Sequence, residues 1–194
     1  MSALIAKITI INDGLQQLGQ PSIANINENS TGAKAMLRAY DMCMLSELAK
    51  HNWKFAIKRA SLAASAFPPE FGKSYRYPLP GDYLRLCPEE TTYDNPRRKD
   101  WEIEGTDIMS DDAAPLEIRY VSSATPESNF HVLFAKSLSC SLAEATCEQL
   151  TNSNTKIETI QSRYLDNIRQ AKKCNAIESA PVKSPTCSWI SVRS

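Results

Sequence analysis

The chain has 194 residues, of which 42% are hydrophobic and 23% are charged, with 22 basic and 22 acidic residues. This length and apolar fraction fit one domain with a real core, or one domain that carries a smaller insertion, and they exclude a wholly disordered chain. A net charge of zero argues against a protein that coats nucleic acid or an anionic membrane. No segment has the uninterrupted apolar run of a signal peptide or a membrane span, so neither is predicted.

Two amphipathic helices are predicted in the first third of the chain. In the first of them, apolar residues recur at helical spacing, at Leu4, Ile8, Ile11, Leu15 and Leu18. Gly19, followed by Pro21, favours a helix end at this point. Ser30 is a good N-cap for the second helix, which we expect to run to about His51.

The middle of the chain differs from its flanks in charge and in proline content. Residues 61–130 carry 7 basic and 13 acidic residues, whereas residues 1–60 carry 7 and 4, and residues 131–194 carry 8 and 5. Seven prolines lie between positions 68 and 115 of this segment, and they exclude long helices there.

Short strands are predicted in this middle segment instead. Apolar and charged residues alternate over 116–120, as in a half-buried strand. Residues 101–103 and 108 lie on either side of Gly105, which predicts a hairpin. Residues 75–77 and 83–87 predict two further strands, separated by a Pro-Gly corner.

Two more helices are predicted after these strands. Thr125 and Pro126 have the residue types of an N-cap and a first helical position. Thr155 and Glu158 have the spacing of a capping box, so they predict the start of the last helix. From about Asn175 the sequence loses its period, and we expect a tail.

The predicted fold class is therefore α+β. We expect an antiparallel bundle of about four helices, with a small antiparallel β module inserted between the second and third helices. Residues 1–60 and 123–175 would form the bundle as one discontinuous domain, residues 61–122 the inserted β module, and residues 176–194 a C-terminal tail.

The sequence offers little for catalysis. Its two histidines, His51 and His131, lie at or near predicted helix ends, and no motif supplies either with a partner for acid–base chemistry. The six cysteines are interpreted as reduced thiols, and the closest two, Cys140 and Cys147, lie two helical turns apart, which favours core packing over zinc binding. We therefore predict no enzyme activity, no cofactor and no metal site.

One cluster has the composition of a nucleic-acid contact. Arg97, Arg98 and Lys99 are consecutive cations with Tyr93 and Trp101 on either side, so they could contact phosphate and stack on bases. Nearby acidic residues dilute the charge, and Trp101 is expected in the β core. We favour a solvated loop or a loop that contacts a neighbouring protein, and keep a nucleic-acid-binding module as an alternative function.

The order of short motifs along the chain is its most specific feature. After Leu18-Gly19 and Ser30 come Trp53-Lys54-Phe55-Ala56, then residues 77–85 (YPLPGDYLR), 101–105 (WEIEG) and 116–120 (LEIRY). In this order, over about residues 4–170, the chain resembles the head-to-tail adaptor proteins of short-tailed phages, which are the tail tubular protein A group and its tail accessory factor relatives.

The resemblance implies a structural virion protein. Such adaptors form a homo-oligomeric ring, commonly twelvefold, between the portal protein of the filled capsid and the tail nozzle protein. Double-stranded DNA passes through the ring without being read, and no membrane is involved. The implied location is the virion, in the tail at the capsid vertex, after assembly in the host cytoplasm. A small tail-associated enzyme is a second alternative, which would need a cleft with paired titratable groups.

The resemblance also suggests candidate contact and structural residues. In relatives the C-terminal segment can reach along the portal, so the candidate portal or partner contacts here are Lys183, Trp189, Ile190 and Arg193. Trp53 and Phe55 are expected to pack where the bundle meets the β module. Pro80 and Asp82 are expected to fix a turn, and Trp101 to fill the β core.

Overall fold

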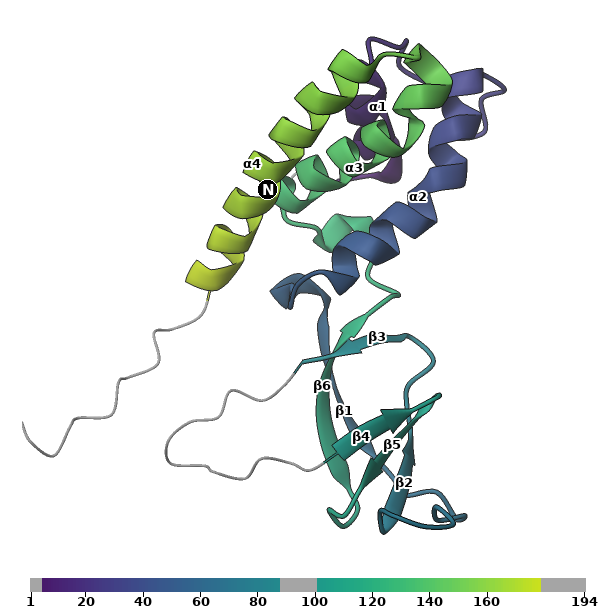
Figure 1. Ribbon diagram of the computed structural model, residues 1–194, viewed down its shortest axis with the longest axis vertical. Helices are drawn as coiled ribbons and strands as arrows, with labels where there is room; N and C mark the ends of the chain where they lie inside the picture. Colours follow the sequence, from purple (N-terminus) through teal and green to yellow (C-terminus); the bar gives the residue numbers. More distant parts are fainter. Residues whose placement is uncertain (1–4, 88–100, 179–194) are drawn as a thin grey trace, which may run out of the picture.

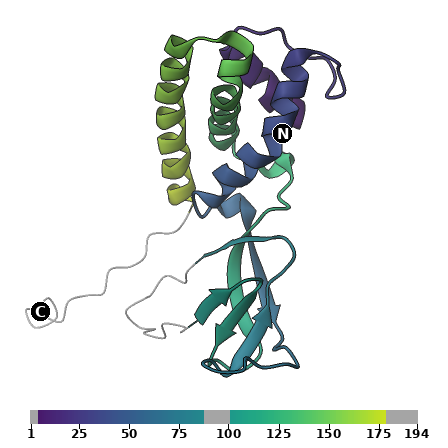
Figure 2. The ribbon, with the colours of Figure 1, turned by 45° about the vertical axis from the view of Figure 1, so that its right-hand side comes forward.

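The computed structural model describes residues 5–87 and 101–178. Within these ranges, helices α1 (Lys7–Gln17) and α2 (Thr31–Ala49) come first, six strands follow, and helices α3 (Val132–Thr151) and α4 (Asn154–Ile177) come last. Figures 1 and 2 show the helices gathered at one end of the long axis and the strands at the other. The predicted α+β class is confirmed.

Helix α3 is the centre of the helical part, because it packs against α1, α2 and α4. Its buried residues include Phe134, Leu138 and Leu142, and they meet the apolar faces of the other helices in one core. The predicted stripe of α1 is buried at Ile11, Leu15 and Leu18, whereas Leu4 lies outside the described residues.

The predicted ends of the first two helices agree with the backbone. Gly19 has a φ of +70° and follows α1, and the amide of Gln20 donates to the carbonyl oxygen of Leu15 at 2.9 Å. Glycine adopts this left-handed conformation without steric cost, so the helix ends there. Ser30 caps α2, since its hydroxyl oxygen accepts from the amide of Ala33 at 3.3 Å.

The strands form two antiparallel three-stranded sheets. The first has the order β1 (Ile57–Leu62), β6 (Leu116–Ser122) and β3 (Tyr83–Leu86), and the second has the order β2 (Tyr75–Pro78), β5 (Asp107–Ser110) and β4 (Trp101–Glu104). Gly105 has a φ of +61° between β4 and β5, as a tight hairpin turn requires.

A single hydrophobic cluster joins the two sheets. The first sheet contributes Leu62, Leu86, Leu116 and Tyr120, and the second contributes Tyr77 and Ile108. Because side chains alternate along a strand, the neighbours of these residues point to the outer faces of the two sheets. Each sheet therefore has one face in this core and one face directed away from it.

Strand β1 corrects the predicted boundary of the bundle, which placed residues 57–60 with the helices. The segment reads Ile-Lys-Arg-Ala-Ser-Leu, so it lacks the clean alternation of a half-buried strand. Pairing with β6, from Ile57 opposite Val121 to Leu62 opposite Leu116, makes it a strand. Tertiary pairing thus decides a segment whose own pattern is weak.

Two predicted helix starts are also wrong. Pro126 is followed by a short 3₁₀ turn at Glu127–Asn129, and α3 begins only at Val132, where Nδ1 of His131 accepts from the amide of Leu133 at 3.2 Å. Thr155 lies inside α4, which begins at Asn154 and has Ser153 at its N-cap position. Helix α4 continues to Ile177, past the expected start of the tail at Asn175.

None of the helices in the described ranges combines the length and the hydropathy needed to cross a lipid bilayer.

Candidate functional site

An aromatic cluster lies where the helices meet the strands. Trp53 is 1% exposed, and its ring stacks on Phe55 at 5.9 Å between centroids and meets Phe134 edge-on at 5.0 Å. Phe55 also packs against Phe130 at 5.6 Å. The indole nitrogen of Trp53 donates to the carbonyl oxygen of Glu47 at 2.9 Å, so this buried polar group is satisfied by the end of α2.

The last turns of α4 hold the segment that contains Trp53. The side-chain oxygen of Asn175 accepts from the amide of Lys54 at 2.8 Å, and its nitrogen donates to the carbonyl oxygen of Asn52 at 3.0 Å. The same nitrogen lies 3.1 Å from Nε2 of His51, whose pKa is lowered mainly by partial burial. One buried amide therefore links the end of α4 to the segment that leads from α2 into β1.

A buried carboxylate reinforces the same place. Glu47 on α2 has no exposed surface, and it accepts from Nζ of Lys50 at 2.6 Å and from the hydroxyl of Tyr164 on α4 at 3.0 Å. From the strands, Arg85 donates to the carbonyl oxygen of Ala49 at 3.0 Å and to the side-chain oxygen of Asn52. We refer to residues 47–55 and the groups that bind them as the junction.

Asp82 organises the corner before β3. Its carboxylate accepts from Nζ of Lys58 at 2.7 Å, from the hydroxyl of Ser122 at 2.7 Å and from the hydroxyl of Tyr120 at 2.9 Å. These donors stabilise the charged form, so the pKa of Asp82 falls to about 2. Burial, together with the Asp82 charge, raises the pKa of Tyr120 to about 12.

The other predicted structural residues lie close to this corner or in the neighbouring sheet. The carbonyl oxygen of Pro80 accepts from the amide of Tyr83 at 2.9 Å, which closes a turn around Asp82. Trp101 lies on β4, opposite Ser110, and packs half-buried against the cluster that joins the sheets.

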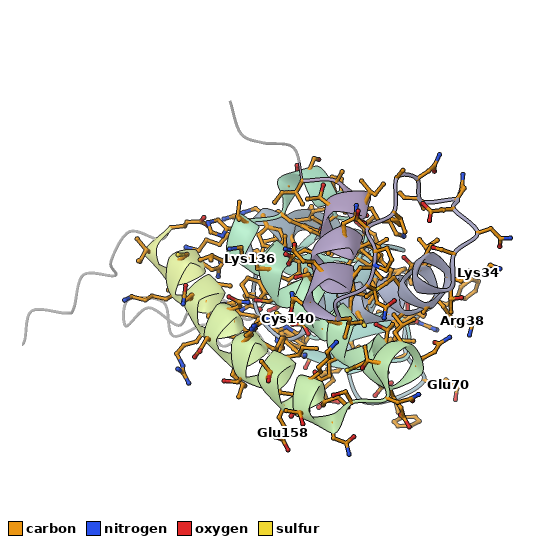
Figure 3. All side chains as sticks on the ribbon, turned by 90° about the horizontal axis from the view of Figure 1, so that it is seen from above. Lys34, Arg38, Glu70, Lys136, Cys140 and Glu158 are labelled. Carbon is orange, nitrogen blue, oxygen red and sulfur yellow. The ribbon has the colours of Figure 1, made fainter. Side chains whose placement is uncertain are left out.

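A polar pocket of about 540 Å³ lies between α1, α3 and α4. Its lining includes Asp13, Lys136, Cys140 and Arg163, and Figure 3 shows Lys136 and Cys140 on α3, between α1 and α4. Asp13 accepts from the hydroxyl of Ser139, so its carboxylate is already engaged. Burial raises the pKa of the Cys140 thiol, which keeps it protonated and a weak nucleophile.

Opposite charges occupy the outer faces of the two sheets. On the first sheet, Arg59 of β1 lies directly opposite Arg119 of β6, and both line a groove of about 350 Å³. On the second sheet, Glu102 and Glu104 of β4 are exposed. Glu102, Glu104 and Arg119 lie within the sequence motifs quoted above, but none of the four residues was predicted as a site residue. The negative charge of the middle segment was visible, but its distribution over faces depends on strand pairing.

Several predicted site residues lie outside the described residues. They are the basic cluster of Arg97, Arg98 and Lys99 and the C-terminal contacts Lys183, Trp189, Ile190 and Arg193. The structure brings together Trp53 with Phe55, and Pro80 with Asp82, but these pairs lie in separate places. Within residues 5–87 and 101–178, no three His, Cys, Asp or Glu side chains converge as metal ligands would.

No protein-family model matches the sequence, and no curated protein matches it at a significant level.

Proposed function

We propose that this protein is a head-to-tail adaptor of a short-tailed phage, a structural virion protein of the tail at the capsid vertex. It would form a homo-oligomeric ring, commonly twelvefold, that binds the portal protein on one side and the tail nozzle protein on the other. Double-stranded DNA would pass through the ring. The order of motifs from Leu18-Gly19 to residues 116–120 supports this proposal.

The observation that carries the proposal is the position of the Trp53-Lys54-Phe55-Ala56 motif. The motif lies at the junction, where buried aromatic packing and hydrogen bonds of 2.8 to 3.0 Å hold α2, α4 and β3 together. An adaptor must present two contact regions in a fixed relation to one another, and a stiff joint between helices and strands serves that need. One of the motifs that carry the resemblance to the adaptors, Trp53-Lys54-Phe55-Ala56, thus lies where the helices are joined to the strands.

The finer architecture belongs to the same proposal. We infer that α1 to α4 are one antiparallel bundle, a discontinuous domain into which the β module is inserted. The chain leaves the helices after Ala49 and returns to them at Val132, and the helical core draws on all four helices. This supports the division into a bundle and an insertion.

Sedimentation with the cognate portal protein tests the proposed function. An adaptor should form with the portal a complex much larger than either protein alone, because a ring of copies assembles on one vertex. A chain that stays monomeric at all concentrations, with portal present, would contradict the proposal. The control is the variant Arg97→Ala, Arg98→Ala, Lys99→Ala, which should bind portal normally, whereas a nucleic-acid-binding module would lose its affinity for DNA.

The C-terminal residues can be tested separately from the rest. Because α4 runs to Ile177 and Asn175 belongs to the junction, the deletion should remove residues 179–194 and leave the helix intact. We expect this variant to keep its circular dichroism spectrum and to bind portal more weakly. Undiminished affinity for portal would show that the C-terminal contacts are wrong and would leave the remaining surfaces as candidates.

A further inference from the structure

The outer face of the first sheet carries an unusual pair of like charges. Arg59 and Arg119 are directly opposite in the β1–β6 register, and Glu117 lies on the same face, opposite Ser61. Like charges at directly opposed positions destabilise an antiparallel pair, because their side chains are neighbours. Arg59 is exposed, and Nε of Arg119 is buried with no hydrogen-bond partner among the residues that the structure describes. The exposed guanidinium of Arg59, next to the charge of Arg119, therefore gives the groove donors and positive charge that an external carboxylate would satisfy.

The outer face of the second sheet carries the complementary charge. Glu102 and Glu104 alternate with Trp101 and Ile103 along β4, so both carboxylates leave the core on the same side. Both are exposed, and neither forms a hydrogen bond or ion pair with another residue in the described ranges. The nearby Asp107 is different, since it is bound by Arg76 at 2.6 Å. Two carboxylates are thus left for an outside partner.

These two faces lie on opposite sides of the cluster that joins the sheets. Arg59 and Arg119 point away from that cluster on one sheet, and Glu102 and Glu104 point away from it on the other. Two different, complementary faces of one chain can join copies head to tail, and such contacts close into a ring when the rotation permits. Charge complementarity across the contact would set its register.

We propose that the Arg59–Arg119 groove of one copy binds the Glu102–Glu104 face of the next copy. The choice of a second copy as the partner rests on the proposed function, in which copies form a ring. The inference adds which two surfaces of neighbouring copies meet. The ion pairs would lie near the rim of the contact, so salt should weaken the association. Charged edge residues can also serve only to prevent strands from pairing between molecules, and the experiment distinguishes this role.

Complementary charge reversal is the test. One variant carries Arg59→Glu and Arg119→Glu, and the other carries Glu102→Arg and Glu104→Arg. Each alone should associate about tenfold more weakly than the wild type, because like charges then meet across the contact. An equal mixture should recover association, since each variant keeps the face that the other lost. Sedimentation velocity measures all three, and circular dichroism checks that each variant folds.

Matched controls carry the same charge changes elsewhere. Lys34→Glu with Arg38→Glu alters two exposed cations on α2, and Glu70→Arg with Glu158→Arg alters two exposed acids. Figure 3 shows Lys34 and Arg38 together on α2. Both controls should associate like the wild type. A mixture of the two test variants that associates no better than either alone would overturn the proposal.

Chemical cross-linking maps the contact directly and does not require a variant that disrupts it. The variant Arg59→Lys, Arg119→Lys keeps both charges and supplies amines that a carbodiimide joins to carboxylates. With labelled and unlabelled chains mixed, peptides that link position 59 or 119 to Glu102 or Glu104 of another chain are expected. They are sought in the protein alone and in its complex with portal, and their absence from both contradicts the proposal.

Other outcomes separate this inference from its rivals. If Arg59→Glu with Arg119→Glu abolished binding of a short DNA duplex and left self-association unchanged, the groove would be a phosphate contact and the proposed interface would be wrong. Portal binding without these cross-links would overturn the interface and keep the adaptor function. These cross-links without portal binding would keep the interface and overturn the adaptor function.

Discussion

At the scale of single residues, Asp82 shows how one side chain can hold several strands. Its carboxylate takes donors from Lys58 on β1 and from Tyr120 and Ser122 on β6, while its own position lies just before β3. A carboxylate with three donors is a strong acceptor, and removing its charge leaves buried hydroxyls with a poorer partner. The three strands of the first sheet therefore depend on one acid for their alignment at this end.

The Asp82→Asn substitution should lower the free energy of unfolding at neutral pH by about 1–3 kcal/mol. The folded-state pKa of Asp82 is depressed to about 2, below the ordinary value of 3.8. Its charged form thus stabilises the fold above pH 3.8, and this contribution is lost as the pH falls through about 2. Urea unfolding measures the difference in free energy of unfolding between variant and wild type. This difference should become smaller as the pH falls from 3.8 to about 2.

The control for this prediction is Asp166→Asn on α4. Asp166 is exposed and pairs with Arg169 at a distance of 3.5 Å, so its removal should have the small effect of an ordinary surface substitution. A gap for Asp82→Asn that stays constant from neutral pH to pH 2 would contradict the assigned role of the carboxylate.

At the scale of elements, helix α4 has two tasks. Its apolar face packs on α3 through Ile160, Ile168 and Ala171, and its last turns bind residues 51–54 through Asn175. The second task explains why a polar residue is buried near the helix end: an amide both donates and accepts, so it can satisfy Lys54 and Asn52 at once. Helix α4 thereby fixes the segment from which β1 begins.

The Asn175→Ala substitution should release that segment. The amide of Lys54 and the carbonyl oxygen of Asn52 would lose their partners, so the free energy of unfolding should fall by about 1–3 kcal/mol. Hydrogen exchange should accelerate at residues 51–54 and in the last turn of α4, before it changes in the centre of α3.

Asn167→Ala on the same helix is the matched control. Asn167 lies in the middle of α4 and donates to the sulfur of Cys140 at 3.4 Å, which is a weaker bond that does not involve residues 51–54. Its replacement should leave exchange at residues 51–54 unchanged. Equal acceleration in both variants would mean that α4 loosens as a whole and that Asn175 has no special role at the junction.

At the scale of the whole molecule, the junction decides how the helices and the strands are oriented. Figures 1 and 2 show the two parts meeting near the ends of α2 and β6, with α4 reaching down beside them. Arg85 is the strand residue that donates across this boundary, to Ala49 and Asn52 at the end of α2. An adaptor with a stiff boundary would present its two contact regions to neighbours without an ordering cost.

The Arg85→Met substitution should loosen this boundary while both parts stay folded. Methionine keeps the apolar stem of the side chain and removes both donors, so the free energy of unfolding should fall by about 1–3 kcal/mol. Small-angle scattering should show a broader distribution of distances than in the wild type, since the two parts would sample more orientations.

Arg76→Met is the control, because Arg76 binds Asp107 inside the second sheet and not at the junction. It should also reduce stability, but its scattering profile should match the wild type. An unchanged profile for both variants would show that the aromatic packing around Trp53 and the hydrogen bonds of Asn175 fix the orientation without Arg85.

The sequence by itself determined the helices and the clearest strands. The apolar period of 3.6 in α1 and the alternation in β6 are local signals, since each reports which side of one element is buried. Gly19 predicted a helix end and Gly105 a hairpin turn from the sequence alone, because a left-handed backbone conformation favours glycine. The predicted packing of Trp53 came from a motif rather than from a period.

Only the tertiary structure decided β1, the junction and the two charged faces. Strand β1 exists because β6 pairs with it, and the opposition of Arg59 to Arg119 is a consequence of that register. Asn175 meets Lys54 across 121 positions of the chain. A sequence pattern fixes periodicity within an element, whereas contacts between distant segments depend on how the elements pack. The junction and the two charged faces are made of such contacts.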